Sequence, residues 1–429
     1  METLADLLYK DYPQGRLVDV LLLPASQLLL QIIVTSAGAR HVITQLPTTK
    51  APFSLKTPLY QEMPVDEDTK DRGTITVFTG AQRPDLLALI QKEDCPLIFM
   101  WPEFLDGAIT TQRYFEKLYD FPQLAKCQLV AVHTLDGTET IVGNGNCIPF
   151  FWRELAGIRG DSKGSDFARV LRTLPDGGFD TILARGVHQV IAREDTKKKL
   201  EPVALTHDQV KDMDSWTLTE PPNALSALAI AVLPAWRSYN VAEMLIKAMK
   251  EVAQAQNLTI LVVPLRPTRK AEFPHVDMAE YLGWSKQTGG QNGKPGMAAT
   301  ELTTSRETSG CNGSSETVSA GNEDSAAFIP FDPWLRKHIR LGARMVKIAR
   351  QSMYIRGSAA EWKNWCDLDV RQQADKAMKQ RKSVWVEPGD TEAPVIFTPS
   401  GCLAPMQYYP SRDVGEYCEP NVWLFHSLD

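Results

Sequence analysis

The sequence predicts an α/β fold of the α+β type: a mixed, mostly antiparallel sheet flanked by helices, with β-rich extensions at both ends. Two strand-like runs, 128–133 and 140–142, flank Asp136-Gly137, a dipeptide typical of a hairpin turn. An almost continuous apolar run at 224–233 and another at 258–265 have the length and composition of strands buried on both faces. Antiparallel and buried parallel strands are therefore both expected.

A helix is expected between the two apolar runs. After Pro234 the apolar residues recur at the i, i+3, i+4, i+7 spacing of one helix face, at Val241, Met244, Leu245, Ala248, Met249 and Val252. The order strand, helix, strand predicts a βαβ-like unit.

Changes in composition along the 429 residues divide the chain into three parts. Short apolar runs and then four prolines predict an N-terminal β-rich appendage and linker, and the C-terminal part is rich in turns and short strands. A stretch dominated by Gly, Ser, Thr, Asn and Glu is predicted to be a mobile insertion. The expected parts are 1–73, a core at 74–356 with insertions at 153–222 and 284–327, and 357–429.

Charge and cysteine usage exclude several classes of protein. Counting 46 Lys+Arg against 52 Asp+Glu gives a net charge of −6, which offers no general attraction to nucleic acid. The seven cysteines show no metal-ligand spacing, so no metal is expected and the thiols are predicted to be reduced. The apolar stretch at 18–34 is interrupted by Asp19 and Pro24, which argues against a membrane span. A cytoplasmic protein is expected.

The segment between the first apolar run and the helix has the features of an anion site. Unpaired backbone N–H groups and the positive end of the helix dipole gather at a helix start, where a pyrophosphate can dock. Arg237 would add a charge-assisted hydrogen bond. Asn240 tolerates a left-handed backbone, and Ala242 is small enough to let a phosphate approach.

These residues resemble the signature of the GNAT acyltransferase superfamily, [Gln/Arg]-x-x-Gly-x-[Gly/Ala], which follows its fourth strand. Here the segment reads Arg237-Ser238-Tyr239-Asn240-Val241-Ala242, so Asn240 replaces the central glycine. The flanking order also agrees, with a hairpin before the motif, a buried strand after it, and then a helix at 333–341 followed by two strands. Three further segments are similar to those of large microbial GNAT-like proteins: Trp101-Pro102-Glu103-Phe104, Phe331-Asp332-Pro333-Trp334-Leu335 and Glu419-Pro420-Asn421-Val422-Trp423.

The resemblance implies an acyl-CoA or coenzyme A co-substrate whose pantetheine arm lies between two splayed strands. An acyl group would pass, by direct attack, to an amine or hydroxyl of a small-molecule acceptor, with an acyl carrier protein as an alternative donor. The cofactor-binding residues that it implies are Ala231, Val232, Leu233, Arg237, Ser238, Asn240, Val241 and Ala242.

Candidates for the acid and the base are less well defined. Tyr281 follows the fifth strand, where the family places the tyrosine that protonates the thiolate, but it is equally a core residue. Glu103 is a candidate base or a capping carboxylate, and His133 a candidate base or a solvated strand end. Candidate substrate-binding residues are Trp101, Asp332, Trp334 and His338. The alternative for two of these is that Asp332 caps the helix at 333–341 and His338 lies on its packed face.

Two other functions stay open at this level. The scaffold could be used for decarboxylation, cyclisation or product release in a biosynthetic pathway, an alternative motivated by Asn240. A non-catalytic protein that binds a ligand or partner is the other.

Overall fold

The computed structural model describes most of the chain from residue 73 onward. The described residues are 59–62, 73–92, 94–158, 165–194, 206–286, 296–297, 328–366, 368–381 and 394–428. The strands expected within 1–58 and most of the segment expected to be mobile lie outside the described residues.

A single large sheet organises the described part of the chain. Its strands follow the order β1-β2-β3-β4-β5-β6-β12-β11-β10, and β9 also pairs with β12. Among the described strand pairs of this sheet, β5 and β6 are parallel and the others antiparallel. This confirms the predicted fold class. The strands are β1 (Leu59–Glu62), β2 (Thr74–Thr79), β3 (Leu129–Leu135), β4 (Thr138–Phe150), β5 (Ala224–Val232), β6 (Ile260–Leu265), β9 (Arg344–Gly357), β10 (Val395–Phe397), β11 (Met406–Tyr409) and β12 (Val414–His426).

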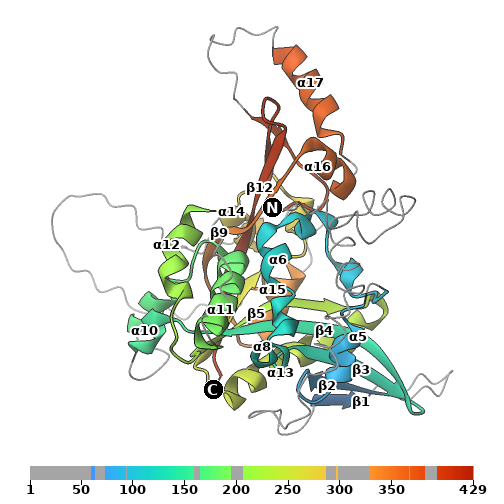
Figure 1. Ribbon diagram of the computed structural model, residues 1–429. Helices are drawn as coiled ribbons and strands as arrows, with labels where there is room; N and C mark the ends of the chain where they lie inside the picture. Colours follow the sequence, from blue (N-terminus) through green and yellow to red (C-terminus); the bar gives the residue numbers. More distant parts are fainter. Residues whose placement is uncertain are drawn as a thin grey trace, which may run out of the picture.

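Helices cover both faces of the sheet (Figure 1). On one face, α13 (Val241–Ala255) packs against β3, β4 and β5, and its buried residues include every member of the predicted apolar series. The other face carries α6 (Ile109–Tyr114) and α11 (Gly178–Glu194), which pack on β9. Within the described part of the chain, no helix is both long and apolar enough to cross a bilayer.

The hairpin predicted at Asp136-Gly137 is present. It joins β3 to β4, and both residues have positive φ, 49° and 79°. Asp and Gly tolerate this conformation, which matches the right-handed twist of the two strands.

The C-terminal part, predicted to be a turn- and strand-rich extension of the core, contributes β10, β11 and β12 to the same sheet. β12 lies between β6 and β9 and pairs with both, so the predicted boundary at 356/357 separates strands that are hydrogen-bonded neighbours. The two strands expected after the helix at 333–341 form the single strand β9. Pairing between segments distant in sequence leaves no local signal, which is why sequence patterns did not indicate it.

The segment expected as an insertion at 153–222 supplies much of the second helical layer. It forms α9 (Arg153–Ala156), α10 (Ser165–Leu171), α11 and α12 (His207–Trp216). Nearly all of α11 is buried, so it lacks the single apolar stripe by which a surface helix is found in a sequence.

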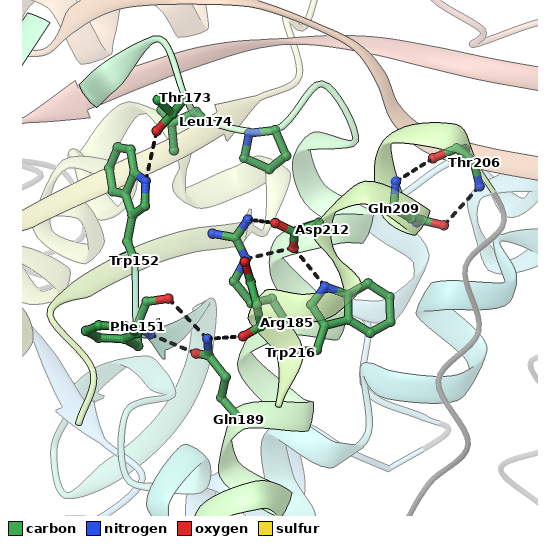
Figure 2. Close-up of polar contacts among 12 residues, drawn as sticks. Phe151, Trp152, Thr173, Leu174, Arg185, Gln189, Thr206, Gln209, Asp212 and Trp216 are labelled. Carbon is green, nitrogen blue, oxygen red and sulfur yellow. Dashed lines mark hydrogen bonds and ion pairs between the residues drawn. The ribbon is translucent and has the colours of Figure 1, made fainter. Parts of the chain in front are cut away.

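Buried polar contacts join α11 to α12 and to the end of β4 (Figure 2). Arg185 forms an ion pair with Asp212, in which Nε lies 2.8 Å from Oδ2, and the same Oδ2 accepts a hydrogen bond from the Trp216 indole at 2.7 Å. The Gln189 amide bonds the backbone N–H and carbonyl of Phe151 and the carbonyl of Ser215. These contacts fix α12 against the core.

Candidate functional site

The two parallel strands at the centre of the sheet separate along their length. β5 pairs with β6 only from Ala224 to Ser226, although β5 continues to Val232. The register against β4 shifts so that Leu228 is an extra residue in β5, and such a bulge bends a strand away from its neighbour. The resulting space beyond Ser226, here called the β5–β6 splay, is the feature that the family resemblance implied.

Solvent reaches this part of β5 from both faces. Ala224 to Leu228 are buried, whereas Ala229 and Ile230 are both partly exposed. Consecutive strand residues point to opposite faces of a sheet. Each face of the sheet is therefore partly exposed at this point of β5.

The backbone of Val232 faces the splay. The N–H of Leu233 donates to the carbonyl of Val142 on β4 at 3.0 Å, and pairing alternates along an antiparallel ladder. The backbone N–H and C=O groups of Ala231 and Leu233 thus point toward β4, while those of Ile230 and Val232 point toward β6. The Val232 carbonyl is consistent with this, because it accepts a hydrogen bond at 3.3 Å from Arg237 Nε, which lies outside β4.

The anion loop has the backbone that its sequence predicts. After the 3-10 turn at Pro234–Tyr239, Asn240 adopts the left-handed conformation with φ 58°, which confirms that expectation. The first hydrogen bond of α13 runs from the Met244 N–H to the Asn240 carbonyl, so the N–H groups of the preceding turn point out of the helix end. Ser238 is exposed beside this helix start.

Three cationic side chains act on Glu243 in the first turn of α13. Glu243 accepts a hydrogen bond from Lys247, which lowers the pKa of its carboxyl, and the charges of Lys337 and Arg340 lower it further. The exposed Arg237 guanidinium adds to this group. The local field thus favours an anion although the chain as a whole is acidic.

The segment 100–104 runs between the ends of β5 and β6. At one end the Met100 sulfur lies 3.9 Å from Arg237 Nη2. At the other, a methyl group added at Gly401 would lie 3.4 Å from the Phe104 ring. Arg266, the residue after β6, donates to the Gly401 carbonyl at 2.6 Å. This segment is here called the rim of the splay, and it carries the exposed Trp101 and Glu103. Glu103 also lies near the Cys366 thiol, whose pKa is raised by burial and by the Glu103 charge. The predicted roles of Trp101 and Glu103 stay predictions.

Tyr281 and Asp332 form a buried pair in the layer on the α13 face of the sheet. Tyr281, on α14 (Met278–Leu282), donates from its hydroxyl to Asp332 Oδ2 at 2.9 Å. Asp332 also caps α15 (Pro333–Arg340) by accepting from the N–H groups of Trp334 and Leu335. Burial and the neighbouring Asp332 carboxylate raise the pKa of Tyr281, which stays protonated near neutral pH.

His133 lies two strands away from the splay. It is buried on β3 with its ring 4.6 Å from that of Trp236, so it packs beneath the anion loop. His338 is also buried, with its ring 4.5 Å from that of Trp334 and its Nδ1 3.0 Å from His426 Nε2. These contacts are packing and capping contacts within the fold. The catalytic role of His133 stays a prediction, and so do the substrate-binding roles of Asp332, Trp334 and His338.

The His338–His426 pair gives the fold a pH dependence. Burial lowers the pKa of His338 to about 3 and that of His426 to about 4, whereas an unfolded histidine has a pKa of about 6.5. The unfolded chain therefore binds more protons, and stability present above pH 6.5 is lost as the pH falls toward 4, by up to about 1.4 kcal/mol per pH unit for each group.

Replacing His426 with Gln is expected to flatten this dependence, as measured by urea unfolding at pH 7, 6 and 5. The slope does not vanish, because burial also lowers the pKa of His188 to about 4. His207→Gln, at an exposed residue of α12, is the matched control. Equal slopes for His426→Gln and the unaltered chain would contradict the assignment.

A buried charged cluster beside the splay was not indicated by the sequence. Arg266 Nε lies 2.8 Å from Glu419 Oε1, and the Tyr417 hydroxyl donates to Glu419 Oε2 at 3.0 Å. The segment around Glu419 was singled out only by its family resemblance. Its pairing with Arg266 depends on β12 docking against β6, a contact between distant parts of the chain.

Among the described residues, no group of three or more His, Cys, Asp or Glu side chains could hold a metal ion. The described cysteines are not paired in disulfides.

Comparison with known proteins adds one informative relative. The chain is 29% identical to "Arginine N-acetyltransferase avaD" of Aspergillus versicolor over 352 residues, which is 82% of this chain and 93% of the relative. No family model matches the chain. The crystal structure of the loading GNATL domain of CurA from Lyngbya majuscula aligns with 69% of this chain and 89% of that domain, at 13% identity and a TM-score of 0.30.

An N-acetyltransferase relative over most of the chain, a left-handed Asn240 in the anion loop and a splayed pair of central strands agree with one another. They confirm the resemblance of this chain to the GNAT acyltransferase superfamily.

Proposed function

We propose that the chain is an acyltransferase that moves an acyl group from acyl-CoA to an amine of a small-molecule acceptor by direct attack. The observation that carries this is the exposure of Ala229 and Ile230, on opposite faces of a central strand, at the place where β5 leaves β6. A donor can enter from one face and an acceptor from the other. The N-acetyltransferase relative makes acetyl-CoA the first donor to test and arginine the first acceptor.

In this proposal the donor lies along β5. Its amide groups would extend the sheet at Val232 and Ile230, and its pyrophosphate would meet the start of α13 and Arg237. Lys337 and Arg340 would add to the field around it. A carrier protein bearing the same phosphopantetheine arm is an alternative donor, distinguished by its lack of the adenosine diphosphate part.

The chemical step forms a C–N bond and breaks the C–S bond of the thioester. The amine gives up a proton and the leaving thiolate gains one, so a base and an acid are needed. Glu103 on the rim is the proposed base. Tyr281 is the proposed acid, and its hydroxyl must then exchange Asp332 for the sulfur. In this proposal the N–H of Ile230 would stabilise the developing oxyanion.

The left-handed Asn240 bears on the alternative functions. Decarboxylation, cyclisation or product release was motivated by the absence of glycine at this position, but Asn240 adopts the backbone that the glycine would supply. The motif therefore no longer favours those reactions over acyl transfer. A non-catalytic binding protein remains the competing reading.

The test is an assay of thiol release and product mass with acetyl-CoA and a panel of amines that includes arginine. Turnover that depends on an amine is expected, and Tyr281→Phe and Glu103→Gln should each lower kcat by about tenfold or more. Binding of acetyl-CoA without transfer to any amine would favour the non-catalytic reading. Full activity in both variants would remove these two residues from the mechanism.

A further inference from the structure

Three side chains hold a short loop across the carboxyl end of β6. The loop Gly401–Leu403, here called the wall loop, receives a hydrogen bond from Arg266 Nη2 to the Gly401 carbonyl at 2.6 Å. Lys270 Nζ donates to the Leu403 carbonyl, also at 2.6 Å, and the Leu403 N–H donates to the Tyr417 hydroxyl oxygen at 2.8 Å. Each residue at the ends of the loop is thus fixed by a side chain from outside it.

The wall loop reaches both faces of the sheet at the carboxyl end of β6. Cys402 packs in the apolar cluster on the α11 face, and Leu403 packs in the cluster on the α13 face. Gly401, with φ 84°, lies against Phe104 and Pro102 of the segment that carries Trp101 and Glu103. The loop therefore supports the rim of the splay from behind.

The anchors are costly groups to bury. Glu419 is fully buried, Lys270 is 1% exposed, and the Arg266 side chain is 17% exposed. Burial lowers the pKa of Lys270 to about 8, because removing the ammonium group from water disfavours its charged form. Apolar residues of similar volume often replace buried ion pairs without loss of stability. These buried charged side chains are therefore better explained by their effect on the position of the wall loop than by a contribution to the stability of the fold.

We propose that Arg266, Lys270 and Tyr417 are positioning residues, which hold the wall loop rigid so that the rim residues Trp101 and Glu103 keep their places toward the acceptor. Glu419 keeps Arg266 and Tyr417 oriented. This inference rests on the proposed acyl transfer. It adds that binding of the acceptor depends on the wall loop, whereas binding of the donor along β5 does not.

The experiment compares Lys270→Met and Tyr417→Phe with the full-length unaltered chain. Tyr408→Phe is the matched control, because Tyr408 is also buried and donates to a carboxylate, Asp413 at 2.7 Å, but lies on β11 outside the wall loop. Steady-state kinetics use acetyl-CoA and the amine active in the transfer assay. Amide hydrogen exchange is measured on peptides covering 399–405.

Both anchor variants are expected to raise the KM for the amine by about tenfold, with the KM for acetyl-CoA changed by less than about twofold. Exchange at Leu403 should accelerate in both and stay unchanged in Tyr408→Phe. An unchanged KM for the amine, an equal rise in both KM values or unchanged exchange would each overturn the inference. If the unaltered chain transfers no acyl group, the proposed function fails by itself, and the exchange measurement still decides whether these side chains hold the loop.

Discussion

Replacing Arg237 with Glu is expected to weaken the binding of acetyl-CoA by about 100-fold, or about 2.7 kcal/mol. Arg237 is exposed next to the start of α13 and is oriented by the carbonyl of Val232. The substitution removes a charge-assisted bond to the pyrophosphate and places a carboxylate among groups that favour an anion. Calorimetric titration of the folded variant with acetyl-CoA measures the effect.

The control for this experiment is Arg412→Glu. Arg412 is an exposed arginine that lies over the Tyr409 ring between β11 and β12, away from the anion loop. It makes the same change in net charge and should leave binding unchanged. Dephospho-CoA should still bind the unaltered chain, because it keeps the pyrophosphate. Equal affinity of Arg237→Glu and the unaltered chain would remove the anion loop from the proposal.

Replacing Asp212 with Ala is expected to lower the free energy of unfolding by about 3–5 kcal/mol. The side chains of Arg185 and Asp212 are only 6% and 12% exposed, so the variant leaves a buried guanidinium without its counter-charge. The Trp216 indole loses its acceptor as well. Urea unfolding followed by circular dichroism gives the change, and α12 should become more susceptible to proteolysis.

Asp120→Asn is the surface counterpart. Asp120 pairs with Lys117 at 2.7 Å, but both side chains are substantially exposed, and such pairs contribute about 0–1 kcal/mol. The double variant Arg185→Met with Asp212→Leu should recover most of the loss, because it removes both charges together. A loss in Asp212→Ala no larger than that in Asp120→Asn would show that the ion pair does not hold α12 in place.

Local patterns in the sequence were enough to predict the elements near the splay. The spacing of apolar residues predicted α13, and Asp136-Gly137 predicted the β3–β4 hairpin. The left-handed Asn240 followed from the small set of residues that tolerate positive φ. Each of these signals is contained within a few residues.

What could not be predicted depends on pairing between distant segments. β12 enters the sheet between β6 and β9, and α11 is covered by α12 and by the sheet, so neither shows the one-sided pattern that locates an element. The contacts that anchor the wall loop could not be predicted for the same reason. Its anchors lie after β6 and on β12, and only the sheet brings Arg266 and Glu419 together.

The central place of β12 has a consequence for how the protein is made. Its three sheet partners, β6, β9 and β11, all leave the ribosome earlier, so each has an unpaired strand edge until β12 is synthesised. Tyr417 and Glu419 lie on β12, so the wall loop gains its Tyr417 hydrogen bond, and Arg266 gains its ion pair with Glu419, only at that stage. Chains that end before β12 would lack the Tyr417 and Glu419 contacts and would expose unpaired strand edges. We expect such chains to aggregate or to be bound by chaperones.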